Sequence, residues 1–224
     1  MAIINRVRWH KQERLNNDMV WVVGSGPSIK GLDFKPLLSS GTVIVVNDVA
    51  MACPKADIWF TLDPWGLHTN QLPENFKGTP YAAVPPDYGT KFAVSPSHKH
   101  MPSRQFRYML RVPQNFDLSD SIRQKNWGLN EDPRCINSGN SAFGALNLAF
   151  HMRPKRIALV GVDATQGYFF NPAKHTRSLN HLPLLFTSAV KQLQRENIEV
   201  FDCSMDGKLK CFKKKPIGSL LRNV

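Results

Sequence analysis

The chain has 224 residues, of which 42% are hydrophobic, and a formal net charge of +12 at pH 7. This length predicts one globular domain, and no apolar run approaches the length of a membrane-spanning helix. The charged first fifteen residues are not typical of a secretory signal peptide. The four cysteines have neither Cys-x-x-Cys spacing nor the density of a disulfide scaffold. We therefore expect a cytoplasmic protein with reduced thiols and no zinc site.

The positive charge is concentrated in three segments. Residues 1–16 carry +3, residues 87–111 carry +4 and residues 203–224 carry +5, so the rest of the chain is neutral. This distribution favours a polyanionic partner, above all nucleic acid. A solvated tail that only aids solubility is the alternative. The expected nucleic-acid contacts are Arg104, Arg107, Arg111, Lys213, Lys214 and Lys215.

Strand and helix patterns alternate along the chain, which predicts a Rossmann-like α/β fold. Such a fold has a mostly parallel sheet with helices on both of its faces. The expected strands are 19–24, 42–46, 58–62, 81–84, 156–161 and 199–202, and the expected helices are 28–38, 142–151 and 182–196. An irregular lid insertion is expected at about 85–134. The domain is thus predicted at 17–205, between a basic N-terminal arm at 1–16 and a basic C-terminal tail at 206–224.

The segment 20–30 carries the clearest motif. A β-branched run enters the turn Gly24-Ser25-Gly26-Pro27-Ser28 and leaves into spaced apolar residues, which predicts a buried strand, a tight turn and a helix. Glycine allows close approach of the backbone, and Pro27 suits the first position of a helix. The N–H groups of the turn and of the helix N-terminus predict a phosphate site. A βα turn that binds nothing is the alternative.

Small or acidic polar residues follow the predicted strands. In a doubly wound sheet, ligands lie beyond the carboxyl ends of the strands. Each polar residue taken alone is typical of a cap or a turn. Together they predict a nucleotide crevice. The positions are Gly24–Gly26, Asn47-Asp48, Asp63, Ser138–Ser141 at the start of a helix, and Gly161–Asp163.

These motifs together resemble a known superfamily. The glycine turn, Asn47, Asp63-Pro64, Ser138-Gly139 and the strand ending in Asp163 resemble the Rossmann-like bacterial CMP-sialic-acid-dependent sialyltransferases. They equally resemble the archaeal 6-hydroxymethylpterin pyrophosphokinase-like proteins. The resemblance covers the chain from about Met19 to Asp202. It is compatible with a phage member of this superfamily.

The sialyltransferase resemblance implies roles for particular residues. Residues Gly24, Ser25, Gly26, Pro27, Ser28 and Asn47 would face the phosphate and sugar of a nucleotide donor, and Ser138, Gly139 and Asn140 would hold the nucleotide. His175 would be the general base that deprotonates the acceptor hydroxyl. His181 is the alternative base.

The chain also departs from the sialyltransferase pattern. Asp63 stands where those enzymes have asparagine, and a carboxylate that faces a phosphate needs a metal ion or a proton. Asp63 and Asp163 are therefore the candidate Mg²⁺ ligands and, with His175, the candidate catalytic residues. The paired tyrosines of that family have no clear match, and Tyr168 is the nearest candidate.

Three functions remain open from the sequence. The first is a glycosyltransferase that uses a nucleotide-activated sugar, with a hydroxylated base in modified viral DNA as one candidate acceptor. The second is a pyrophosphokinase-like phosphotransferase in which Asp63 and Asp163 hold magnesium. The third is a non-catalytic nucleic-acid-binding protein on a degenerate nucleotide fold.

Overall fold

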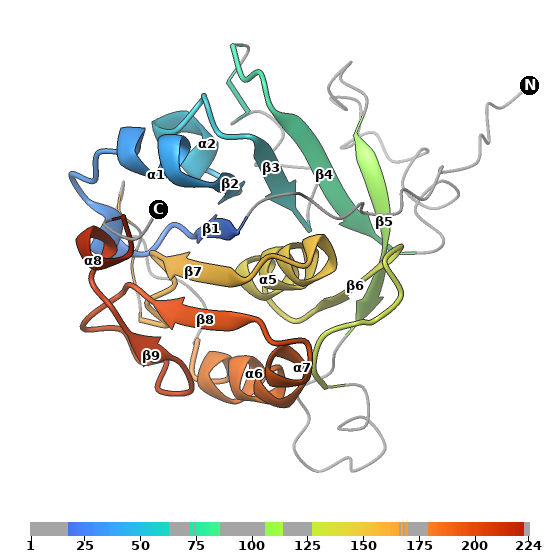
Figure 1. The fold of residues 1–224 in the computed structure, drawn as a ribbon. Coiled ribbons are helices and arrows are strands. Elements are labelled where there is room, and N and C mark those ends of the chain that lie inside the picture. The colour runs from blue at the N-terminus through green and yellow to red at the C-terminus, as the bar shows by residue number, and fades with distance from the viewer. Residues whose placement is uncertain are drawn as a thin grey trace, which may run out of the picture.

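A computed structural model describes residues 18–62, 72–73, 75–85, 106–113, 127–165, 167, 169 and 179–221. The arm predicted at 1–16 lies outside these residues. Within them, nine strands form one sheet in which all neighbouring strands are parallel (Figure 1). The strands are β1 Met19–Val23, β2 Thr42–Val46, β3 Ile58–Thr61, β4 Thr79–Val84, β5 Arg107–Pro113, β6 Cys135–Ser138, β7 Arg156–Val160, β8 Glu199–Asp202 and β9 Lys213–Lys214.

The strand order places a topological switch point in the middle of the sheet. The order is β6-β5-β4-β3-β2-β1-β7-β8-β9, so the chain builds outward from β1 to β6 and then returns to lay β7 against the other side of β1. A crevice forms beyond the carboxyl ends of the strands where the order reverses, and here that point lies between β1 and β7.

Helices cover both faces of the sheet, as the alternating pattern predicts. They are α1 Lys35–Ser40, α2 Val49–Ala52, α5 Ser141–Met152, α6 Leu182–Ser188, α7 Val190–Arg195 and α8 Ile217–Leu221, with a 3-10 helix η1 at Pro27–Ile29. Alternate residues of a strand point to opposite faces. In β1, Val20 and Val22 therefore pack in the core beneath α5, α6 and α7, whereas Trp21 and Val23 pack in a second core beneath α1, α2 and α8.

Two predicted helices are interrupted in the structure. The helix expected at 28–38 is divided into η1 and α1, and Gly31 between them has a left-handed φ of 78° that ends helical geometry. The helix expected at 182–196 is divided into α6 and α7, which meet at Ala189.

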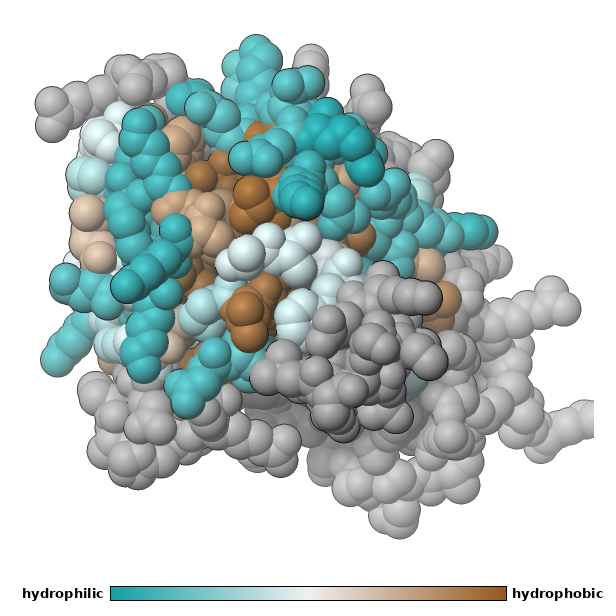
Figure 2. Space-filling model, turned by 90° about the horizontal axis from the view of Figure 1, so that it is seen from below, coloured by the Kyte–Doolittle hydropathy of each residue, from teal (hydrophilic) through white to brown (hydrophobic). Residues whose placement is uncertain are grey.

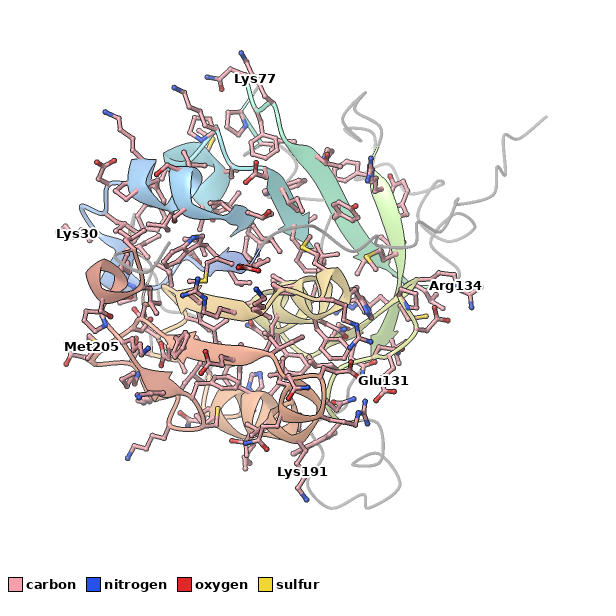
Figure 3. The ribbon with its side chains drawn as sticks, viewed as in Figure 1. Lys30, Lys77, Glu131, Arg134, Lys191 and Met205 are labelled. Atoms are coloured by element: carbon pink, nitrogen blue, oxygen red, sulfur yellow. The ribbon has the colours of Figure 1, made fainter. Side chains whose placement is uncertain are left out.

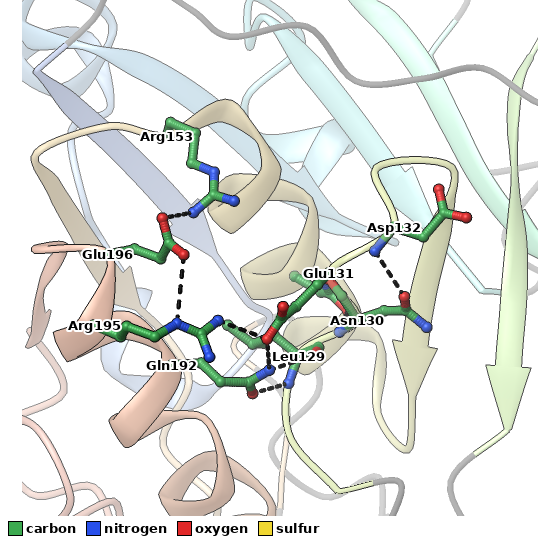
Figure 4. Close-up of polar contacts among 9 residues, drawn as sticks. Leu129, Asn130, Glu131, Asp132, Arg153, Gln192, Arg195 and Glu196 are labelled. Atoms are coloured by element: carbon green, nitrogen blue, oxygen red, sulfur yellow. Dashed lines mark hydrogen bonds and ion pairs between the residues drawn. The ribbon is translucent and has the colours of Figure 1, made fainter.

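The predicted lid insertion at 85–134 contains a strand. Its described part includes β5, which pairs with β4 on one side and β6 on the other. The segment after it is tied to α7 through polar contacts (Figure 4). The Gln192 amide accepts a hydrogen bond from Leu129 N at 2.6 Å and donates to Leu129 O at 2.8 Å, while Arg195 pairs with Glu131 at 2.6 Å. This part of the insertion therefore packs as part of the domain.

The segment predicted as a basic tail at 206–224 is, as far as Leu221, an ordered part of the fold. Strand β9 extends the sheet beside β8, and Leu220 of α8 is buried in the second core. Lys214 reaches under the β8–β9 loop and pairs with the fully buried Asp202 at 2.5 Å. The prediction of a tail was wrong because Lys214 faces inward, and the run Lys213–Lys215 does not reveal which of its lysines does so.

The described residues contain no helix that is long and apolar enough to cross a membrane. All four cysteines are free thiols, and burial raises the pKa of Cys53 to about 11 and that of Cys203 to about 12. Hydrophilic side chains surround a smaller apolar area on the face seen from below Figure 1 (Figure 2). Among the described residues, the large apolar side chains that are exposed come from separate elements: Met51 of α2, Leu184 of α6 and Met205 of the β8–β9 loop.

Candidate functional site

A pocket of about 540 Å³ lies at the switch point that the strand order defines. Its walls come from the segments that follow β1, β2, β3 and β7 and from the first turn of α5. This is the position where open α/β sheets bind their ligands. The lining residues are Gly24–Gly26, Val46–Asp48, Leu62, Arg111, Gly139–Ala142, Gly161–Thr165, Gly167, Leu179 and Leu182.

The glycine turn after β1 packs directly on the turn after β7. Gly24 N donates to Val160 O and Gly26 N donates to Gly161 O, both at 2.8 Å. A Cβ atom on either Gly24 or Gly26 would lie 2.7 Å from Gly161 O, so both positions require glycine for close backbone approach. The sequence predicted that these N–H groups face a phosphate, but at Gly24 and Gly26 they already bind protein acceptors.

Asp163 holds this turn in place. Its carboxylate accepts hydrogen bonds from Ser28 N at 2.8 Å and from Ser28 Oγ at 2.5 Å, and its side chain is buried. An internal carboxylate thus occupies the N-terminus of η1, where the sequence predicted a phosphate. Within the described chain, no group of three or more acidic, histidine or cysteine side chains could hold a metal ion. Asp63, the other predicted Mg²⁺ ligand, lies outside the described residues.

Arg111 supplies a cation to the opposite end of the pocket. Its Nε donates to Ser138 Oγ at 2.9 Å, and its Nη1 donates to Leu62 O at 3.2 Å. Ser138 is buried and in turn donates to Val112 O, so its hydroxyl fixes the direction of the guanidinium. Sequence reasoning placed Arg111 on a nucleic-acid surface and Ser138 against the nucleotide. The structure places Arg111 in the pocket and Ser138 behind it.

The N-terminus of α5 lies on the same side as Arg111. Gly139, Asn140 and Ser141 line the pocket, and Asn140 caps the helix by accepting a hydrogen bond from Ala142 N at 2.8 Å. A twelve-residue helix presents partial positive charge at this end. Together with Arg111, it makes this end of the pocket suitable for an anion.

Asn47 lines the pocket between its two ends. Its backbone is fixed by Trp59 Nε1, which donates to Asn47 O at 2.8 Å, and its φ of 50° is a left-handed value that asparagine tolerates better than most residues. The side-chain Oδ1 is buried and has no hydrogen-bond partner among the described residues. A buried acceptor of this kind requires an explanation, and a ligand donor would supply one.

Of the two candidate general bases, the structure describes only His181. His175 lies outside the described residues, as does Tyr168. His181 is the N-cap residue of α6, makes no capping bond with its side chain and forms a hydrogen bond with the backbone of Gly139. Leu179 and Leu182 on either side of it line the pocket, whereas His181 itself does not. Burial lowers the pKa of His181, so the neutral imidazole that a general base requires is favoured near pH 7.

Among the described residues, those predicted to contact nucleic acid lie toward opposite edges of the sheet, with Arg107 and Arg111 on β5 and the lysines at β9. Arg107 donates to Tyr81 Oη at 3.0 Å, and Arg104 lies outside the described residues. Lys213 is exposed, Lys214 forms the ion pair with Asp202, and Lys215 Nζ lies 4.1 Å from the centre of the Phe201 ring. Lys214 is therefore a structural residue.

Sequence reasoning missed the apolar wall at Leu62, Leu179 and Leu182 and the position of Arg111. A signal for Arg111 was present, because the apolar residues Tyr108–Leu110 and Val112 around it are typical of a strand, and such a strand would have carried Arg111 toward the carboxyl edge.

Comparison with known proteins adds no constraint: no protein-family model matches this chain, and no curated protein matches it significantly.

Proposed function

We propose that this chain is a transferase that binds a nucleotide-activated sugar in the switch-point pocket. The observation that carries the proposal is the polarity of that pocket. One end has Arg111 and the N-terminus of α5, and the other end has Asp163 and the glycine turn. A donor with an anionic phosphate and hydroxyl-rich sugars has matching polarity.

The extent of the pocket supports a donor of this size. Its walls follow β7, β1, β2 and β3, which are adjacent in the sheet. Three spacings between adjacent strands amount to about 14 Å. The phosphate would lie near Arg111 and α5, because the N–H groups of Gly24, Gly26 and Ser28 already bind protein acceptors. A hydroxyl or amino group of the donor would satisfy the buried Oδ1 of Asn47.

The proposed reaction is an inverting displacement at the anomeric carbon. The acceptor hydroxyl attacks that carbon while a histidine, His181 or His175, takes its proton. The bond between the anomeric carbon and the phosphate oxygen breaks, and the leaving nucleotide keeps the electron pair. Arg111 would stabilise the negative charge that develops on this phosphate.

Nucleotide binding is the first test. Thermal unfolding should be measured with CMP, UDP, GDP and ATP, each with and without Mg²⁺, since a ligand that binds the folded state raises its stability. We expect one nucleotide to stabilise the wild type, and Arg111→Ala to weaken its binding about tenfold or more by loss of a charge-assisted contact. Arg134→Ala is the matched control, because Arg134 is exposed and pairs only locally with Asp132.

Two outcomes would contradict the proposal. The absence of any shift in the wild type would exclude the pocket as a nucleotide site. A shift that is confined to ATP and requires Mg²⁺ would favour the pyrophosphokinase-like phosphotransferase instead.

A further inference from the structure

Four exposed lysines lie on the two segments that bond to Asp163 or in the strand that follows, and none of them lines the pocket itself. We call them the lysine rim: Lys30 follows η1, Lys208 and Lys210 lie on the β8–β9 loop, and Lys213 begins β9. Figure 3 shows Lys30 and Met205, which belong to these two loops, on the same side of the molecule. The sequence places Lys208, Lys210 and Lys213 in the basic segment 203–224, and of the rim only Lys213 was among the expected individual contacts.

The β8–β9 loop is attached firmly to the pocket wall. Lys208 N donates to Asp163 O at 2.8 Å, and Ser204 Oγ lies 3.3 Å from Ser28 Oγ. Lys214 Nζ holds the loop from beneath by donating to Ser204 O at 2.5 Å and to Gly207 O at 3.0 Å. The rim therefore keeps a fixed position relative to the pocket.

The charges of this region are not balanced locally. Lys214 neutralises the buried Asp202, so the ion pair adds no net charge at the surface. Leu209 is completely buried between the exposed Lys208 and Lys210, which directs both lysines outward. Asp206 of the same loop, Asp33 after Lys30 and the Asp163 carboxylate are the acidic side chains of these segments, so the four rim lysines exceed them by one charge. A rigid excess of lysines beside a pocket favours a ligand that carries several negative charges.

We propose that the lysine rim binds the phosphate backbone of a nucleic-acid strand and so delivers the acceptor to the pocket. Only the acceptor role rests on the proposed transferase function. Nucleic acid fits better than an anionic membrane, because stable membrane association requires a lipid anchor or an apolar surface beside the cations. The rim offers one exposed apolar side chain, Met205.

The test compares two double variants of equal net charge. Lys208→Gln with Lys210→Gln removes two charges from the rim, and Lys77→Gln with Lys191→Gln removes two exposed charges from elsewhere (Figure 3). Binding of a fluorescent 20-nucleotide DNA, single-stranded and duplex, should be measured by anisotropy at several salt concentrations. We expect the rim variant to bind tenfold or more weakly and to lose roughly 1.5 to 2 from the slope of log K against log salt.

The outcomes are separable from those of the nucleotide test. Equal losses in both double variants would show that only overall charge matters, and would overturn the proposal. Salt-insensitive or undetectable binding by the wild type would also overturn it, as would preferential binding to phosphatidylserine vesicles. Rim-dependent DNA binding without any nucleotide-induced thermal shift would support the rim while rejecting the transferase. Thermal shifts with rim-independent DNA binding would do the reverse.

Discussion

Ser28 and Asp163 are 135 residues apart in sequence, and their hydroxyl and carboxylate oxygens meet at 2.5 Å. The contact joins the turn after β1 to the segment after β7, across the switch point of the sheet. Asp163→Asn should lower the free energy of unfolding by about 1.5 to 3 kcal/mol, because the amide is uncharged and offers one acceptor oxygen to the two donors of Ser28. Ser28→Ala should cost less, since the bond from Ser28 N remains. Urea denaturation measures the free energy of unfolding of both variants. Equal values for Asp163→Asn and the wild type would show that the contact between Ser28 and Asp163 does not stabilise the fold.

Gly26 provides a purely steric test of the same junction. A Cβ atom there would lie 2.7 Å from Asp163 Cγ, although the φ of Gly26 is an ordinary −65°. Gly26→Ala should therefore destabilise the fold by about 1 to 3 kcal/mol through overpacking. Gly218→Ala in α8 is the control, because no atom lies within 4 Å of its Cβ position and alanine favours a helix. If Gly26→Ala leaves the free energy of unfolding unchanged, the turns after β1 and β7 can move apart at little cost.

Lys214 should contribute more to stability than its neighbour Lys213. Lys214→Met leaves Asp202 buried without its counter-charge, which should cost about 3 kcal/mol, whereas Lys213→Met should be nearly neutral. Burial already raises the pKa of Asp202 despite Lys214. Loss of Lys214 raises that pKa further, so the deficit of Lys214→Met should shrink as the pH falls and the carboxyl takes up a proton. Denaturation at pH 7 and pH 4.5 checks this, and a pH-independent deficit would contradict it.

His151 of α5 should make the fold sensitive to mild acid. Its Nε2 lies 2.9 Å from Cys135 O, and burial lowers the pKa of the imidazole. The unfolded chain takes up a proton near pH 6.5 while the folded state resists it. The free energy of unfolding should therefore decrease as the pH falls below about 6.5.

His151→Gln should show a smaller pH dependence of stability between pH 7.5 and 5.5 than the wild type. Some dependence should remain, because the pKa of His181 is lowered as well. Identical slopes in wild type and variant would show that His151 does not carry the effect.

Strands β1, β2, β3 and β7 were predictable because their sequences are nearly continuous apolar runs, which is typical of strands buried on both faces. The expected bounds of β2 and β8 are correct, and β1, β3 and β7 end one residue earlier than expected. Strand β5 was missed because Arg107 and Arg111 interrupt its apolar residues and Pro113 ends it, so it lacks the continuous apolar run of its neighbours. Parallel pairing also leaves no hairpin signal between neighbours, so the residues alone did not reveal the partners of β5.

The position of the crevice was predictable, but its internal partners were not. Strand ends meet at one edge of a parallel sheet, so Gly24, Asn47, Gly139 and Asp163 were expected together, and they all line the pocket. The pairing of Asp163 with Ser28 depends on how closely two turns pack. The ion pair of Lys214 depends on which lysine of three faces inward. Neither distance is encoded in local sequence pattern.

The position of β7 also constrains how the chain assembles during synthesis. β1 pairs with β2 on one side and with β7 on the other, and β7 begins at Arg156. Until that segment has left the ribosome, one edge of β1 has no strand to pair with. An open apolar edge can pair with another chain, so the nascent protein passes through a stage at risk of aggregation. Formation of the crevice must come late, because the loop after β7 forms one of its walls.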